Sequence, residues 1–136
     1  MAEPKLINSW EVKPFKMDET YESRMILDDI VAGTKTVQVN EGTLKGGCAT
    51  GGDIHNGDEI YYIVKGEAEL RLGDDIRDVK QGSLAFIPSG VFHSLKNKSA
   101  AEDFVLLTLW TDAAYNDTYE LRMRVWGKSF KTIHED

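Results

Sequence analysis

The chain has 136 residues, of which 41% are hydrophobic and 29% charged, and its formal charge at neutral pH is −7. A chain of this length buries about two-thirds of its unfolded surface around one core, so the sequence predicts a single domain over residues 1–136. The acidic balance argues against a nucleic-acid partner or an anionic membrane surface, because both are bound through clustered Lys and Arg. No continuous apolar run reaches the length of a membrane span.

The N-terminal residues, MAEPKLINSW, lack the basic and apolar regions of a secretory signal. The single cysteine, Cys48, cannot form an internal disulfide, which agrees with a reducing compartment. We therefore expect a cytoplasmic protein, with Cys48 acting as a small buried hydrophobic side chain.

Most of the chain has the pattern of short strands separated by turn residues. Residues 7–29 indicate an additional edge strand, and from residue 34 to residue 111 helix-length amphipathic periodicity is missing. β-Branched and aromatic residues are frequent there. The sequence therefore predicts an all-β domain with strands in residues 34–44, 59–66, 67–73, 76–82, 83–90, 91–97 and 104–110.

Two turns and the C-terminal segment complete the predicted elements. Residues 73–75 (GDD) and 80–82 (KQG) are typical of hairpin connections, so we expect antiparallel neighbours around each. Residues 112–130 indicate a short helix followed by a strand or tail. No repeat, low-complexity segment or long linker is present, so we place no domain boundary.

The segment 51–66, GGDIHNGDEIYYIVKG, carries a histidine and a glutamate four residues apart. A helix is a poor host, because each glycine in a helix interior costs about 1 kcal/mol. In a strand, alternate side chains share a face. If the loop at 56–58 preserves this parity, one face carries Asp53, His55, Glu59 and Tyr61.

This segment resembles the first of the two cupin motifs, G-x5-H-x-H-x3–4-E-x6-G. The chain has Gly47-x5-Asp53-x-His55-x3-Glu59-x6-Gly66. Every spacing matches, and the one departure is Asp53, which replaces the first histidine.

A second segment matches the second cupin motif without departure: Gly82-x5-Pro88-x-Gly90-x2-His93-x3-Asn97. The motifs cover residues 47–66 and 82–97, and fifteen residues separate them. The resemblance implies a double-stranded β-helix, a small jelly-roll barrel over about residues 20–112 with its ligand site inside the barrel mouth. We expect tight turns at Gly66 and Gly82, and a turn at 88–90 that directs His93 inward.

In cupins that bind metal, the residues matching His55, Glu59 and His93 coordinate a divalent ion. Two imidazoles and one carboxylate also form a facial triad that leaves coordination positions open. The alternative is that these groups are buried and bonded only to each other. Burying Glu59 beside Asp53 without a cation is costly, so we favour a metal. Nitrogen and oxygen ligands without thiolate suit one divalent transition ion: Fe, Mn, Zn, Ni or Co.

Asp53 has two open interpretations, a fourth ligand or a base beside a bound water, and we favour ligation. Tyr61 shares parity with Glu59 and is expected to line the pocket, so we name Asp53, Glu59 and Tyr61 as catalytic candidates. Other aromatic residues fit the core: Phe86, Phe104 and Trp110. Three arginines fit either an anchor for a substrate carboxylate or phosphate or a surface ion pair: Arg24, Arg122 and Arg124. His134 is expected to have no role.

The resemblance to cupins leaves several functions open, because this fold serves many chemistries. We favour a metal-dependent enzyme acting on a small oxygenated metabolite, with oxidative cleavage by a dioxygenase slightly preferred. A metal-dependent isomerase, lyase or decarboxylase is the alternative, and a non-catalytic module binding a small ligand is the rival. By the same resemblance we expect a homodimer.

Overall fold

The structure is a computed structural model and describes residues 4–16, 18–28, 31 and 36–111. After a short 3-10 turn, η1 (Ser9–Glu11), the elements are strands: β1 (Phe15–Lys16), β2 (Tyr21–Leu27), β3 (Val37–Leu44), β4 (Glu59–Lys65), β5 (Glu67–Leu72), β6 (Asp75–Lys80), β7 (Leu84–Ile87), β8 (His93–Asn97) and β9 (Phe104–Thr111). The predicted all-β class is confirmed. Arg122, Arg124, His134 and the helix predicted in residues 112–130 lie outside the described residues.

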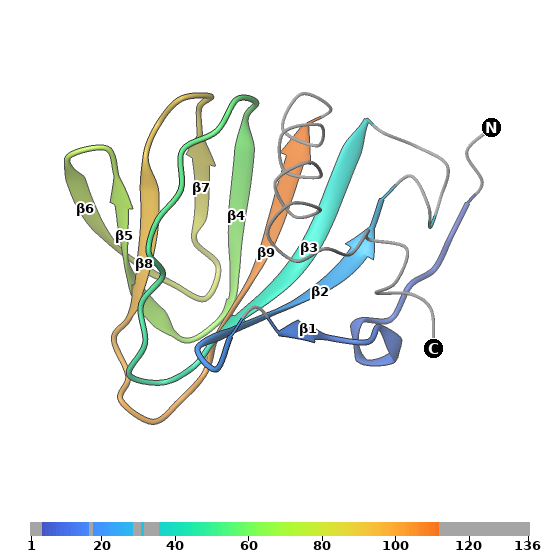
Figure 1. Cartoon of the computed structure of the whole chain (residues 1–136), viewed down its shortest axis with the longest axis horizontal. Coiled ribbons are helices and arrows are strands. Elements are labelled where there is room, and N and C mark those ends of the chain that lie inside the picture. The colour runs from blue at the N-terminus through green and yellow to red at the C-terminus, as the bar shows by residue number, and fades with distance from the viewer. Residues whose placement is uncertain (1–3, 17, 29–30, 32–35, 112–136) are drawn as a thin grey trace.

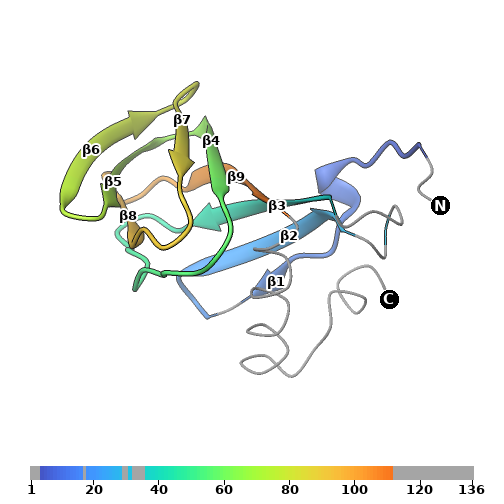
Figure 2. The same cartoon turned by 90° about the horizontal axis from the view of Figure 1, so that it is seen from above.

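The strands form two antiparallel sheets that share one core (Figure 1). The larger sheet has the order β1-β2-β3-β9-β4-β7, and the smaller has the order β6-β5-β8. Consecutive strands repeatedly change sheet, as the view from above shows for β4 to β5 and for β6 to β7 (Figure 2). This is the predicted jelly-roll barrel. None of the described helical segments is long and apolar enough to cross a membrane.

The additional edge strand predicted in residues 7–29 is present. β2 pairs antiparallel with β3, and the short β1 pairs with β2 at the edge of the larger sheet. These two strands extend the wall of the barrel, so the N-terminal segment belongs to the sheet that positions the site.

Only one of the two predicted hairpin turns joins antiparallel neighbours. Residues 73–75 do connect antiparallel neighbours, β5 and β6. The prediction for residues 80–82 was wrong, because β6 pairs with β5 whereas β7 pairs with β4. Gly82 donates its N–H to the carbonyl of Ile63 at 3.0 Å, and Ile63 donates to the carbonyl of Ser83 at 2.9 Å. The turn is thereby attached to β4 and carries the chain from the smaller sheet to the larger one.

The interior of the barrel is apolar at one end and polar at the other. The apolar end is a cluster of buried side chains from both sheets, including Leu44, Ile63, Leu70, Phe104 and Leu106. Further along β2, β3, β4 and β9, several inward positions are buried and polar, and these form the polar end: Ser23, Gln38, Asn40, Glu59 and Thr108. On the same strands, Met25 and Trp110 pack with Val12 in a second, smaller apolar cluster. The candidate Glu59 therefore lies at the polar end, whereas Tyr61 belongs to the first apolar cluster.

The predicted aromatic core is partly confirmed. Phe104 and Trp110 are buried. The prediction for Phe86 was wrong, because its side chain is 54% exposed. Strand alternation turns the neighbouring Ile87 inward, where it is buried in the core, so Phe86 faces outward on β7.

Candidate metal centre

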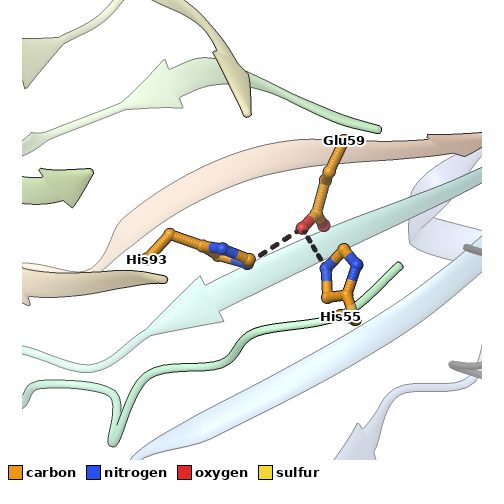
Figure 3. A group of neighbouring side chains, drawn as sticks. All are labelled: His55, Glu59 and His93. Atoms are coloured by element: carbon orange, nitrogen blue, oxygen red, sulfur yellow. Dashed lines mark hydrogen bonds and ion pairs between the residues drawn. The ribbon is translucent and has the colours of Figure 1, made fainter. Parts of the chain in front are cut away.

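Three side chains from separate parts of the barrel meet at the polar end (Figure 3). Glu59 is the first residue of β4, His93 is the first residue of β8, and His55 lies in the loop that precedes β4. Oε1 of Glu59 lies 3.1 Å from Nε2 of His55 and 3.1 Å from Nε2 of His93. One ligand atom from each of the three residues lies within 4.8 Å of the others. The structure thus brings together the three residues that the cupin motifs single out.

The second nitrogen of each imidazole faces a backbone carbonyl. Nδ1 of His55 lies 3.1 Å from the oxygen of Asn56, and Nδ1 of His93 lies 2.9 Å from the oxygen of Val91. A proton on Nδ1 satisfies these carbonyls and leaves Nε2 with a lone pair for a cation, which is how metal-ligating histidines are oriented. The donor set therefore fits a divalent transition ion.

The charges of the three groups are strongly coupled. The hydrogen bond with Glu59 raises the pKa of His55 to about 9. Burial would lower the pKa of His93, but its bonds to Glu59 and Val91 outweigh burial and raise it. Burial would raise the pKa of Glu59, yet hydrogen bonds from both histidines leave it lowered. Glu59 is therefore ionised at neutral pH, and its negative charge attracts protons or a cation to this point.

Asp53 lies beside this group, but its carboxylate is exposed and is not part of the cluster of His55, Glu59 and His93. It forms an isolated antiparallel bridge with His93, and directly opposed residues project to the same face. The exposed carboxylate accepts the N–H of Ile54 through Oδ1 at 2.8 Å. Its charge adds the smallest of the contributions to the raised pKa of His55, after the hydrogen bond to Glu59. Both interpretations of Asp53, ligand and base, stay predictions.

Tyr61, two residues after Glu59 on β4, contacts the ring of His93. Its ring lies 5.8 Å from the ring of His93 at an interplanar angle of 80°. Burial raises the pKa of Tyr61 well above its ordinary value, so the phenol keeps its proton. It can donate a hydrogen bond to a group bound at the centre.

Arg24 and Cys48 are not brought to the centre. Nε of Arg24 donates to the carbonyl of Val12 at 3.1 Å, and Nη1 lies 3.9 Å from Oε1 of Glu41. Arg24 therefore takes part in an ion pair, with Glu41 as the partner. Cys48 is half-buried and packs against the apolar core.

The sequence interpretation missed a row of polar residues next to the centre. The strand register places Asn40 opposite Thr108, and Thr108 opposite Tyr61. Oδ1 of Asn40 accepts the hydroxyl of Ser23 at 2.7 Å. Oγ1 of Thr108 is buried and has no hydrogen-bond partner, and the same holds for both amide atoms of Gln38. The signal was present in the sequence as polar residues at inward positions of β3 and β9.

Comparison with known proteins agrees with this arrangement. The family model described as "Cupin domain" matches residues 40–110, which include both motifs. The chain belongs to the cupin family. An uncharacterized protein of Streptomyces coelicolor, SCO3923, is 27% identical over an alignment of 103 residues that covers 74% of this chain and 96% of that protein.

Two solved cupin-like structures have the same fold. A predicted oxalate decarboxylase from Thermotoga maritima has a TM-score of 0.70 and 24% identity, and the match covers 79% of this cupin and 98% of that chain. The polyketide cyclase RemF from Streptomyces resistomycificus has a TM-score of 0.72 and 19% identity, covering 81% of this cupin and 80% of that chain. At these identities the likeness shows the fold alone.

Proposed function

We propose that this cupin is a metal-dependent enzyme that acts on a small oxygenated metabolite. The observation that carries the proposal is the convergence of two Nε2 atoms on the carboxylate of Glu59, with both Nδ1 atoms facing carbonyls. The charge of a buried carboxylate is costly unless a cation compensates it. Here the protonated forms of His55 and His93 compensate the charge of Glu59. A divalent ion would take the place of their Nε2 protons.

The residues that would hold the ion are His55, Glu59 and His93, with Asp53 as the fourth ligand that we favour. A bound divalent ion would act as a Lewis acid on a substrate oxygen, and a redox-active one would add oxidation chemistry. The imidazoles are oriented by their Nδ1–H bonds. The two carboxylates are the candidate proton acceptors, and the Tyr61 phenol is the candidate proton or hydrogen-bond donor.

The surroundings of the centre support an oxygenated substrate. Beside it lie neutral groups that donate and accept hydrogen bonds: the amide of Asn40, the hydroxyl of Thr108 and the phenol of Tyr61. The described inward positions of β2, β3, β4, β7 and β9 carry no Lys or Arg. A substrate rich in hydroxyl or carbonyl oxygen satisfies such a wall better than an anion does.

Two reaction types compete. Oxidative cleavage by a dioxygenase is slightly favoured, because a facial triad leaves open coordination positions. The second candidate is non-redox chemistry by an isomerase, lyase or decarboxylase. This candidate rests on analogy with two proteins of the same fold, a predicted oxalate decarboxylase and a polyketide cyclase.

The first experiment is elemental analysis of protein purified without chelators, which identifies the ion. Oxygen uptake by the iron-loaded protein is then measured over a panel of small acids, catechols and diketones, with His93→Ala as the matched control. Uptake that depends on His93 supports the dioxygenase. Turnover without oxygen by a Mn- or Zn-loaded form supports the second candidate, and tight binding without any turnover supports the non-catalytic module.

The role of Asp53 is tested separately with Asp53→Asn and Asp53→His. If Asp53 is a ligand, the Asn variant loses metal and the His variant, which restores the usual cupin motif, regains it. If the Asn variant keeps its metal while turnover falls by about a hundredfold or more, Asp53 is the base and ligation is wrong.

We also propose a cytoplasmic homodimer. Seven outward residues of β4, β7 and β9 form an apolar face, with Lys65 at one end of β4: Ile60, Tyr62, Val64, Leu84, Phe86, Leu107 and Leu109. Several of them are exposed. Each chain has a formal net charge of −7, so two copies repel each other. The exposed apolar face is the surface through which they can associate. A monomeric mass by light scattering at micromolar concentration would contradict the dimer. The proposed location rests on the sequence, whose single cysteine agrees with a reducing compartment.

A further inference from the structure

One ligand of the metal centre lies on a loop, whereas the other two lie on strands. Glu59 and His93 begin β4 and β8, where ladder hydrogen bonds hold their backbones. His55 lies between the isolated bridge at Asp53 and the start of β4. Its backbone therefore needs support from outside the two sheets.

That support comes from the turn at residues 88–90 in the second motif. Oγ of Ser89 accepts the N–H of Gly57 at 2.9 Å, and Oδ1 of Asp58 accepts the N–H of Ser89 at 3.1 Å. Gly90 donates its N–H to the carbonyl of His55 at 2.9 Å. The side chains of Asp58 and Ser89 thus join the two motifs reciprocally, although neither residue occupies a specified position of the cupin pattern.

We propose that Asp58 and Ser89 form a clasp that positions His55 and determines how long the centre retains its ion. The proposal rests on the proposed metal site. A loop ligand reaches its geometry only when its backbone is fixed, and outer groups that orient a ligand typically change metal affinity 10- to 100-fold. The bonds of the clasp involve neither Glu59 nor His93, whose backbones the strand ladders hold, so we expect the clasp to act through His55.

The test begins with Ser89→Ala and a matched control, Ser99→Ala. Ser99 makes comparable bonds in another exposed turn, since its Oγ accepts the N–H of Ala101 at 3.2 Å and of Glu102 at 2.9 Å. Zn²⁺ dissociation is followed by chelator competition. We expect Ser89→Ala to release Zn²⁺ roughly tenfold or more faster than wild type, and Ser99→Ala to match wild type. Equal rates in the two variants would overturn the clasp.

Two further variants separate positioning from a general loss of structure. Asp58→Asn keeps an oxygen acceptor for the Ser89 N–H and is expected to retain Zn²⁺ like wild type, whereas Asp58→Ala is expected to release it quickly. Ser89→Ala and Asp58→Ala should release Zn²⁺ at similar rates, because each variant breaks the same reciprocal pair. Fast release from Ser89→Ala with wild-type release from Asp58→Ala would show that the two side chains do not act together.

A readout in metal-free protein keeps the clasp distinct from the proposed function. The rings of His55 and His93 lie 5.1 Å apart between centroids, so wild type is expected to show a nuclear Overhauser effect between their ring protons. Ser89→Ala is expected to weaken it and Ser99→Ala to keep it. If wild type binds no metal, the proposed function fails and this measurement alone decides the clasp, with an unchanged effect in Ser89→Ala overturning it.

Discussion

The apolar and polar ends of the barrel interior share the strands β3, β4 and β9 and differ in what they bury. Along β9, Phe104 and Leu106 are completely buried in the apolar cluster, while Thr108 lies beside the metal centre with an unpartnered hydroxyl. Apolar burial stabilises a fold, and unpartnered buried polar groups destabilise it. The apolar end therefore supplies stability, and the polar end retains costly groups that a bound ion and substrate would satisfy.

The largest expected effect lies at the apolar end. Phe104→Ala should lower the free energy of unfolding by about 3–5 kcal/mol, because it leaves a cavity between both sheets. Urea denaturation measures this loss. The variant should still bind one ion per chain under conditions where it is folded. A loss of less than about 1 kcal/mol would show that the core is elsewhere.

Removal of the ion should have a smaller effect on the fold. The stabilisation by a ligand is that of simple linkage, so chelation should cost a few kcal/mol at most. The β-type circular dichroism should persist, because the apolar cluster does not depend on the centre. Loss of that signal on chelation would contradict the division of roles between the two ends.

A pH dependence of metal-free protein sharpens the comparison further. The folded-state pKa of His55 is raised to about 9, above its ordinary 6.5. Its contribution to stability is therefore fully present below about pH 6.5 and is lost as pH rises through about 9. The urea midpoint of chelated wild type should fall between these values, and that of His55→Ala should fall less. If the urea midpoint falls equally with pH in chelated wild type and in His55→Ala, the pair of His55 and Glu59 does not form in solution.

The smallest expected effect is that of Thr108→Val. Because Oγ1 of Thr108 is buried without a partner, removing it should leave stability unchanged or raise it by up to about 1 kcal/mol. Thr43→Val is the control, because it makes the same exchange at a buried threonine on the opposite face of the same sheet. A clear destabilisation by Thr108→Val relative to Thr43→Val would mean that the hydroxyl has a structural partner.

The sequence predicted the strands, and it also predicted that His55, Glu59 and His93 lie together; their role as metal ligands stays a prediction. Strand alternation and turn glycines are local signals, and the spacing of His55, Glu59 and His93 is specific to one fold. The connection at residues 80–82 was mispredicted, because a tight turn does not reveal whether the next strand pairs back or crosses to the other sheet. The clasp between Asp58 and Ser89 joins residues 31 positions apart through side chains, and no local pattern indicates such a contact.

The central claim is that His55, Glu59 and His93 hold one divalent ion. The most direct test is the metal content of wild type, His55→Ala, His93→Ala and the control Ser99→Ala after purification without chelators. Each histidine variant deletes one nitrogen ligand from a small set. The account predicts about one ion per chain in wild type and in Ser99→Ala, and loss of most of it in both histidine variants. Full occupancy in both histidine variants would contradict the assignment of the site.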